Sequence, residues 1–397
     1  MYFSLLQESN NMLQSIDAPI VIIGSGFAAY QLIRAIRRTD ASTPIQVFTA
    51  DEGHDYNKPD LSHVFSKRQL ASDLVRSQGS EIANELNFEL YANTYVEAII
   101  PQRHSLIAAG REFPYAKLVL ATGARAFVPP MLGNAVDKVV TLNSLQEYQA
   151  AESDLALAKR VLVIGGGLIG TELSMDLASA GKKVITVDPC MQLMASLLPE
   201  YIATQLGKQM QRQGVYLALN NSVNSLNTAA DQATIVATLA SAEQLEVDMV
   251  ISAAGLLPNI QLAQQAGISV GRGVLVNDYM ETSAKDIFAL GDCAEINGKV
   301  LAYLQPALLS ANALAKTLLG QPTKLSMPAM LVKVKTPHYP IQLAGQAVDG
   351  VYRWQMDIDA QGSSVKAFAH NGDLQGFVVA EQHMNNAFSL LKALPRT

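Results

Sequence analysis

Two stretches of the chain share one pattern of apolar and polar positions. Residues 18–29 form an unbroken apolar run that ends in the motif G-x-G-x-x-A, and residues 160–170 repeat it with G-x-G-x-x-G. Apolar residues at helical spacing follow each motif. Such a run is typical of a fully buried strand in a parallel sheet, and the later spacing of 3 to 4 residues indicates an amphipathic helix. The pattern therefore predicts two strand-turn-helix units of one type.

The small residues of each motif have separate physical uses. The first allows a tight turn, the second lets the backbone approach a pyrophosphate at the helix N-terminus, and the third lets helix and strand pack closely. They are Gly24, Gly26 and Ala29, with Phe27 and Ala28 between them, and Gly165, Gly167 and Gly170, with Leu168 and Ile169 between them. One motif alone also fits any tight strand-helix turn, but two complete copies predict two dinucleotide sites.

An acidic residue ends the second strand of each unit. Asp51 and Asp188 stand about 20 residues beyond their motifs, the spacing at which a carboxylate accepts a hydrogen bond from a ribose hydroxyl. Asp188 would also repel the 2′-phosphate of NADP, and Pro189, Cys190 and Met191 after it include no arginine to bind one. The second unit is therefore predicted to bind NADH.

Composition narrows the class of protein. The 397 residues are enough for two to three domains. A hydrophobic fraction of 49% with 16% charged residues excludes a disordered chain, and the net charge of −6 argues against nucleic acid as a ligand. Cys190 and Cys293 are far apart and in no C-x-x-C motif, which excludes a disulfide framework, a cysteine-bound metal and a redox dithiol.

The ends of the chain carry little chemical signal. No apolar run reaches the roughly 18 residues of a membrane span, and the start lacks the basic region of a signal peptide, so we expect a cytoplasmic protein without membrane contact. Residues 1–17 precede the first predicted strand and are expected to be either a disordered leader or the result of a misassigned start, since Met12 lies just before the strand.

Further motifs give the chain a family resemblance. Residues 118–125 contain a strand and an A-T-G turn, residues 248–259 a second strand ending in A-A-G, and residues 287–294 the sequence I-F-A-L-G-D-C-A. With these the chain resembles the FAD-dependent pyridine-nucleotide oxidoreductases, α/β proteins in which one Rossmann-like domain is inserted into another. The resemblance implies an FAD-binding domain at 18–122 and 255–320, an NAD-binding domain at 123–254, and a small C-terminal α+β domain at 321–397.

The resemblance also implies which residues bind the two cofactors. Those expected at tightly bound FAD are Gly24, Gly26, Phe27, Ala28, Ala29, Asp51, Lys58, Val96, Ala121, Thr122, Gly123, Arg125, Gly291, Asp292, Leu304, Gln305 and Lys335. Those expected at NADH are Gly165, Gly167, Leu168, Ile169, Gly170, Glu172, Asp188 and Gly255. From its position alone, Asp292 fits a helix N-cap as well as a ligand; the resemblance assigns it to the ribityl chain of FAD. No metal site is expected.

One loop points to a branch of this family. Residues 56–63 resemble the loop Y-x-R-P-x-L-S-K of rubredoxin and ferredoxin reductases, with Lys58 and His63 in place of the arginine and the second basic residue. Together with residues 126–130, 291–298 and 327–337, the loop resembles the flavorubredoxin-reductase group. This implies electron transfer from NADH through FAD to the rubredoxin module of a flavorubredoxin, in nitric oxide detoxification.

The same resemblance implies roles for three residues near the flavin. Glu172 and Lys335 are the candidates for tuning flavin electronics, and His63 either pairs with Glu172 or is structural. The tail from residue 321 has 7 basic and 5 acidic residues. We therefore expect an acidic electron carrier to dock on Lys333 and Lys335 with Lys58, Lys67 and Arg68, although Lys333 alone also fits a lysine that guards an edge strand.

Two other functions fit the same residues. The first is an enzyme of this architecture that reduces a ferredoxin-type carrier or oxygen. The second is a non-enzymatic redox sensor that binds FAD and NADH. The fold alone does not separate these uses.

Overall fold

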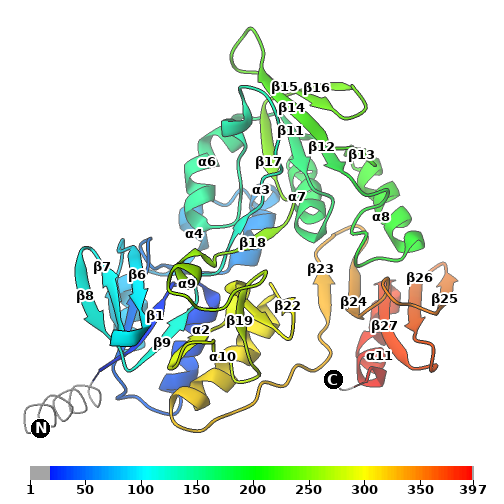
Figure 1. The fold of residues 1–397 in the computed structure, drawn as a ribbon. Coiled ribbons are helices and arrows are strands. Elements are labelled where there is room, and N and C mark those ends of the chain that lie inside the picture. Colours follow the sequence, from blue (N-terminus) through cyan, green and yellow to red (C-terminus); the bar gives the residue numbers. More distant parts are fainter. Residues whose placement is uncertain (1–17, 396–397) are drawn as a thin grey trace, which may run out of the picture. The chain divides into compact units, whose positions relative to one another are not determined.

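The computed structural model describes residues 18–395 and divides into two compact units (Figure 1). The first comprises the described residues up to Asn57, Val75–Arg125 and Leu257–Met327. The second comprises Lys58–Leu74, Ala126–Leu256 and the described residues from Pro328 onward. The predicted leader at residues 1–17 lies outside the described residues, and the four-part domain division stays a prediction.

A five-stranded parallel sheet forms the centre of the first unit. Its strand order is β20-β9-β1-β2-β5. The bounds are Ile287–Ala289 for β20, Lys117–Leu120 for β9, Ile20–Ile23 for β1, Ile45–Phe48 for β2 and Glu89–Tyr91 for β5. All four residues of β1 are buried, as expected of a central strand covered on both faces. The unbroken apolar run in the sequence therefore predicted this strand correctly.

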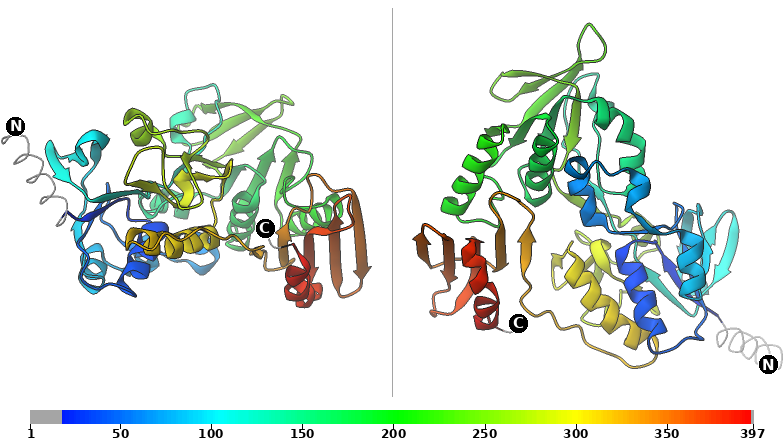
Figure 2. Two further views of the ribbon diagram at one scale, coloured as in Figure 1. Left: turned by 60° about the horizontal axis from the view of Figure 1, so that its bottom comes forward. Right: turned by 180° about the vertical axis from the view of Figure 1, so that it is seen from behind.

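Helices and a second sheet cover the parallel sheet. Helices α2 (Phe27–Arg37) and α10 (Leu304–Leu318) pack against each other (Figures 1 and 2). The antiparallel sheet β6-β7-β8 (Val96–Ile100, Ser105–Ala108, Arg111–Pro114) contributes to the same core, where Phe113 of β8 makes edge contacts with the rings of Phe48 and Tyr91. The smaller elements are β3 (Asp55–Tyr56), β4 (Val75–Ser77), α5 (Gly79–Glu85), α9 (Gln261–Gln265), β19 (Val274–Val276), β21 (Ala294–Ile296) and β22 (Lys299–Val300).

The second unit repeats the parallel arrangement around the second motif. Its four-stranded sheet has the order β13-β12-β11-β17, with bounds Tyr216–Leu219, Lys183–Asp188, Arg160–Ile164 and Met249–Ser252. Helices α6 (Leu145–Leu157), α7 (Leu168–Ser179) and α8 (Glu200–Arg212) belong to it, as does the antiparallel sheet β14-β15-β16 (Val223–Thr228, Ile235–Leu239, Gln244–Val247). Two parallel α/β sheets, each with one glycine motif after a central strand, are thus present, as predicted.

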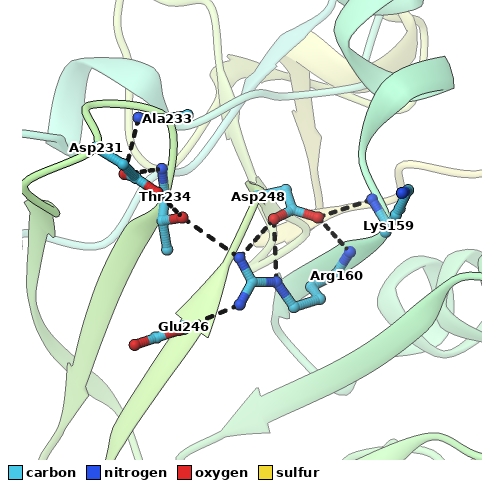
Figure 3. A network of polar contacts seen from close by, with 7 residues as sticks. All are labelled: Lys159, Arg160, Asp231, Ala233, Thr234, Glu246 and Asp248. Atoms are coloured by element: carbon cyan, nitrogen blue, oxygen red, sulfur yellow. Dashed lines mark hydrogen bonds and ion pairs between the residues drawn. The ribbon is translucent and has the colours of Figure 1, made fainter.

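An ion-pair network fixes the start of β11 (Figure 3). Arg160 donates to Asp248 Oδ1 from Nε at 3.0 Å and from Nη2 at 2.7 Å, and the backbone N–H groups of Lys159 and Arg160 donate to Oδ2 at 2.8 Å. Glu246 accepts from Nη1 of the same guanidinium at 3.3 Å. Burial works to raise the pKa of Asp248, but these hydrogen bonds outweigh it and hold the pKa below its usual range.

The C-terminal part of the second unit is an antiparallel sheet with one covering helix. Its order is β23-β24-β27-β26-β25, with bounds Val332–Val334, Ile341–Gly345, Leu374–Glu381, Gly362–Phe368 and Arg353–Asp359. Helix α11 (Ala387–Ala393) covers one face, where Ala387 packs with Ala344, Phe377 and Val379. Strands followed by a helix were predicted for this tail.

The chain crosses between the two units at several points, among them after Arg125 and after Leu256. The short strands β10 (Ala124–Ala126) and β18 (Leu256–Pro258), which span these two crossings, pair with each other. Within residues 18–395, every helix is too short or too polar to cross a membrane. The same residues contain no group of three or more His, Cys, Asp or Glu side chains that could hold a metal ion.

Candidate dinucleotide sites

The first glycine motif makes a turn that only glycine can occupy. Gly24 has φ +111°, and a Cβ there would lie 2.2 Å from the carbonyl oxygen of Ala121 at the end of β9. The N–H of Ala121 in turn donates to Ile23 O at 2.9 Å. The motif and the A-T-G turn, far apart in sequence, are therefore adjacent at the carboxyl edge of the sheet, where α/β proteins bind nucleotides.

The N-terminus of α2 is suited to hold a phosphate. Gly26 is the N-cap residue, no side chain caps the helix, and its first turn has no acidic residue. A Cβ at Gly26 would meet no atom within 4 Å, so the small residue leaves open space rather than relieving a clash. Free backbone N–H groups at a helix N-terminus attract an anion. This geometry fits the pyrophosphate of a dinucleotide.

Two later segments of the chain, η4 and the start of α10, also lie against α2. Gly291 has φ +76°, and a Cβ there would lie 2.8 Å from Ala28 Cβ, so η4 (Gly291–Cys293) packs directly on the start of α2. Asp292 lies in η4 beside it. Leu304 and Gln305 form the exposed first turn of α10, which packs on α2 and η4.

Asp51 lies at the carboxyl end of β2, next to the motif. Its Oδ1 accepts hydrogen bonds from Thr49 Oγ1 at 2.7 Å, from Ser25 Oγ at 3.0 Å and from the N–H of Gly53 at 2.9 Å. The N–H of Asn93 donates to Asp51 O at 2.8 Å and brings the segment before β6, and hence Val96, to the same edge. All of the predicted FAD residues except Lys58 and Lys335 belong to this unit.

The second motif repeats this geometry in the second unit. Gly165 has φ +112°, and a Cβ there would lie 2.5 Å from Ala253 O; a Cβ at Gly170 would lie 1.9 Å from Gly165 O. Gly167 is the N-cap of α7, which has neither a capping side chain nor an acid in its first turn, and its Cβ position is open. Leu168 and Ile169 begin the helix, and Gly255 follows β17 with φ +115°.

Asp188 ends β12 beside this turn. Its Oδ2 accepts from the N–H of Gly166 at 2.6 Å and its Oδ1 from the N–H of Cys190 at 2.7 Å. The carboxylate is thereby fixed next to the glycine turn at the position expected to face a ribose. Its negative charge also disfavours a 2′-phosphate.

Glu172 connects three segments of the second unit. Its side chain is 5% exposed. Oε2 accepts from Ser62 Oγ at 3.0 Å and lies 3.5 Å from Nε2 of the largely buried His63, while Oε1 accepts from the backbone N–H of Lys335 at 2.8 Å. Glu172 therefore contacts Lys335 through the backbone of Lys335, and it lies beside His63, the ion-pair partner that the sequence analysis considered for it. The ammonium group of Lys335 donates to Pro59 O at 3.2 Å.

Asp176 is a residue that the sequence analysis missed. It lies one turn after Glu172 on α7 and is 6% exposed. It accepts from the N–H groups of Phe65 at 2.8 Å and Ser66 at 3.3 Å, and from Ser66 Oγ. It thus holds the start of α3 (Val64–Lys67) against α7. The spacing of four residues between Glu172 and Asp176 was the available signal.

The remaining predicted residues lie on this loop or close to it. Lys58 begins η1 (Lys58–His63), and the side chains of Lys67, Arg68, Lys333 and Lys335 are exposed. The contact between Lys335 and Pro59 joins the two segments that carry these cations.

Cys293 is fully buried, and burial raises the pKa of its thiol, which agrees with its interpretation as a small core residue.

The chain is similar to known proteins over most of its length. Residues 18–313 match the family model described as pyridine nucleotide-disulphide oxidoreductase, and residues 324–394 match the rubredoxin binding C-terminal domain. Curated relatives named nitric oxide reductase FlRd-NAD(+) reductase are similar over nearly their whole length. The protein of Vibrio vulnificus (strain CMCP6) is 53% identical over 95% of this chain and 98% of its own. That of Escherichia coli (strain SMS-3-5 / SECEC) is 48% identical over 95% and 99%.

Solved structures share the fold at lower identity. The covalent putidaredoxin reductase-putidaredoxin complex aligns with TM-score 0.87 at 24% identity, over 96% of this chain and 94% of the other. The NADH:rubredoxin oxidoreductase from Clostridium acetobutylicum aligns with TM-score 0.79 at 20% identity, over 95% and 94%. These likenesses confirm the predicted α/β fold class.

Proposed function

Because this chain belongs to the pyridine nucleotide-disulphide oxidoreductase family, we propose that it transfers electrons from NADH, through FAD, to the rubredoxin module of a flavorubredoxin in the cytoplasm. One observation carries the choice of acceptor. The match to a rubredoxin binding domain covers residues 324–394, and the first residues of that domain are hydrogen-bonded to the nucleotide helix α7 through Lys335 and Glu172.

The two glycine turns supply the binding sites for the cofactors. The N-terminus of α2, with Gly26 open in front of it, fits the pyrophosphate of FAD, and Asp51 fits its ribose. The N-terminus of α7, with Gly167 and Asp188, fits NADH in the same way. When bound, FAD supplies the conversion of a two-electron hydride donor into a one-electron donor.

The protein's own contribution to the reaction is orientation. In this family of reactions the cofactor carries the chemistry, and the protein positions the reacting groups and sets their electrostatics. Glu172, buried and hydrogen-bonded on both oxygens, is a rigid negative charge in the cluster that contains His63 and Lys335. We assign this cluster to the flavin edge, where Glu172 and Lys335 tune the electron affinity of the ring.

The rubredoxin module is proposed to dock on a cationic face, defined as Lys58, Lys67, Arg68, Lys333 and Lys335. All five residues belong to the second unit, and Lys335 contacts the segment that carries Lys58. An acidic carrier approaching these side chains would be steered by its charge, which raises the association rate more than the final affinity.

Anaerobic mixing tests the proposed reaction. The FAD-loaded protein is mixed with NADH and an oxidised rubredoxin module, and the visible band of rubredoxin is followed. We expect the band to bleach rapidly with NADH and poorly with NADPH. If the flavin is reduced by NADH while rubredoxin stays oxidised, the proposed acceptor is wrong. The proposal that the two sites bind FAD and NADH would still be supported.

A further inference from the structure

Strand β25 is an edge strand without cover on either face. It spans Arg353–Asp359 at the end of the five-stranded C-terminal sheet, and each of its seven residues is exposed. An edge strand presents unpaired backbone N–H and C=O groups that another strand can bind. β25 is therefore the point at which this sheet can be extended.

One face of β25 is an apolar row. Trp354, Met356 and Ile358 alternate along the strand and are 44%, 45% and 49% exposed. Their neighbours across the sheet, Ala367, Val365 and Ser363, are buried. The row thus continues a buried, largely apolar face to the open edge, where each of the three large residues is about half exposed and the indole N–H of Trp354 donates to Ala347 O at 3.0 Å.

The opposite face is charged, and its charges are ordered along the strand. Arg353 lies over the ring of Phe368 at 5.0 Å, Asp357 pairs with Lys366 at 3.2 Å, and Asp359 pairs with His383 at 3.1 Å. The positive charge stands at one end of the strand and an acidic residue at the other. Such a strand is complementary to its own antiparallel copy.

We propose that β25 pairs with β25 of a second copy of this chain, so that the two C-terminal sheets join into one ten-stranded sheet. When a two-fold axis perpendicular to the sheet passes between the two copies of Met356, all seven residues of each β25 strand are paired. This register sets Arg353 opposite the partner's Asp359, Trp354 opposite the partner's Ile358, Gln355 opposite the partner's Asp357, and Met356 opposite its own copy. Such an interface is isologous and closed.

This register satisfies the rules for cross-strand pairs. Two ion pairs form at the ends, two aromatic and β-branched pairs lie beside the centre, and no like charges face each other. The six apolar side chains of the two rows form one cluster on a single face. Because strand pairing buries less surface than a standard interface, we expect a reversible dimer that depends on protein concentration.

Charge variants test the register by complementation. Arg353→Asp alone sets two pairs of acidic residues face to face, and Asp359→Arg alone sets two pairs of arginines face to face. We expect each variant to be monomeric by sedimentation velocity up to about 100 μM, where mass action favours assembly, and an equimolar mixture of the two to form a heterodimer. The wild-type chain is expected to dimerise under the same conditions.

A central substitution and a matched control complete the experiment. Met356→Lys sets two ammonium groups opposite each other and is expected to raise the dissociation constant at least tenfold, while Leu157→Lys, on the exposed end of α6, leaves it unchanged. Circular dichroism checks that each variant is folded. A wild-type chain that stays monomeric, a dimer that Met356→Lys does not weaken, or a variant mixture that does not associate would each overturn the proposal.

Discussion

Glu172 and Asp176 lie one turn apart on α7, and their carboxylates hold Ser62 and Ser66, which are also four residues apart. Ser62 Oγ donates to Glu172 and Ser66 Oγ to Asp176. The two acids therefore have the same four-residue spacing as the two serines that they bind. The segment with these serines begins with Lys58 and contains His63. Helix α7, whose N-terminus is proposed to bind NADH, therefore also fixes the loop that is assigned to the flavin edge.

Asp176→Ala should loosen this loop. The substitution leaves the N–H groups of Phe65 and Ser66 without their acceptor, and the loss of hydrogen bonds to a buried carboxylate costs about 1.5–3 kcal/mol. Urea unfolding should show this decrease, and hydrogen exchange should be faster in residues 62–67. Asp154→Ala, at an exposed position on α6, is the control; equal effects of both variants would refute the role of Asp176.

Alanine at Gly26 and at Gly167 should separate the two cofactor sites. Neither Cβ would meet an atom of the protein within 4 Å, and both residues have extended backbone with negative φ. Both variants should therefore fold. Gly26→Ala should lower the FAD content of the purified protein, and Gly167→Ala should keep FAD and raise the KM for NADH about tenfold or more, because a methyl group at the turn displaces the pyrophosphate. Loss of FAD from Gly167→Ala, or an unchanged FAD content with a raised KM for NADH in Gly26→Ala, would contradict the account.

Asp188→Ser should weaken the preference for NADH. The change removes the proposed ribose acceptor, and a hydrogen bond to a charged group is typically worth about 1.5–3 kcal/mol. It also removes the negative charge that repels a 2′-phosphate. We expect kcat/KM to fall about tenfold or more with NADH and to rise with NADPH. A variant that loses activity equally with both donors would show that Asp188 only supports the turn at Gly166.

The Arg160–Asp248 network should make stability depend on pH. The folded-state pKa of Asp248 is lowered from its ordinary value of 3.8, so its stabilising contribution is fully present above that value and is lost as pH falls through the folded pKa. Asp248→Asn should therefore cost about 1–3 kcal/mol at neutral pH, and this difference should shrink below about pH 4. Urea unfolding at several pH values measures the difference in unfolding free energy between the wild type and the variant. A difference that stays constant with pH would be inconsistent with the network.

Charge reversal at Lys67 and Lys333, two exposed members of the cationic face that have no assigned role at the flavin, tests docking. The double change to glutamate should slow reduction of an acidic rubredoxin about tenfold at low salt, with less effect at high salt, because steering is screened. Turnover with NADH and ferricyanide should stay the same. Lys208→Glu, on the exposed side of α8, is the control. An equal loss with both acceptors would show that the lysines support the flavin site rather than docking.

Sequence periodicity predicted the parts of the fold whose physical cause is local. The strands before Gly24 and Gly165 are apolar because both faces of a parallel sheet are covered, and the glycines are required by positive φ and close backbone contacts. Asp51 and Asp188 could be singled out because a ribose site needs an acid at the end of the second strand, and the structure places both carboxylates beside the glycine turns. These features depend on a few neighbouring residues.

Other features depend on contacts between distant segments and could not be predicted. No sequence motif contains Asp176, and only the packing of residues 65–66 on α7 gives it a role. The hydrogen bond from the backbone N–H of Lys335 to Glu172 joins residues 163 positions apart, which no local pattern indicates. Exposure of both faces of β25 likewise follows from its edge position, which alternation of side chains does not reveal.

Competition between two acceptors tests the central claim most directly. The FAD-loaded protein is reduced by NADH under anaerobic conditions and offered an equal concentration of rubredoxin module and of a [2Fe-2S] ferredoxin, and the reduction of each is followed at its own wavelength. The account predicts that rubredoxin is reduced with the higher kcat/KM. Faster reduction of the ferredoxin, or reduction of neither by a flavin that NADH readily reduces, would contradict it.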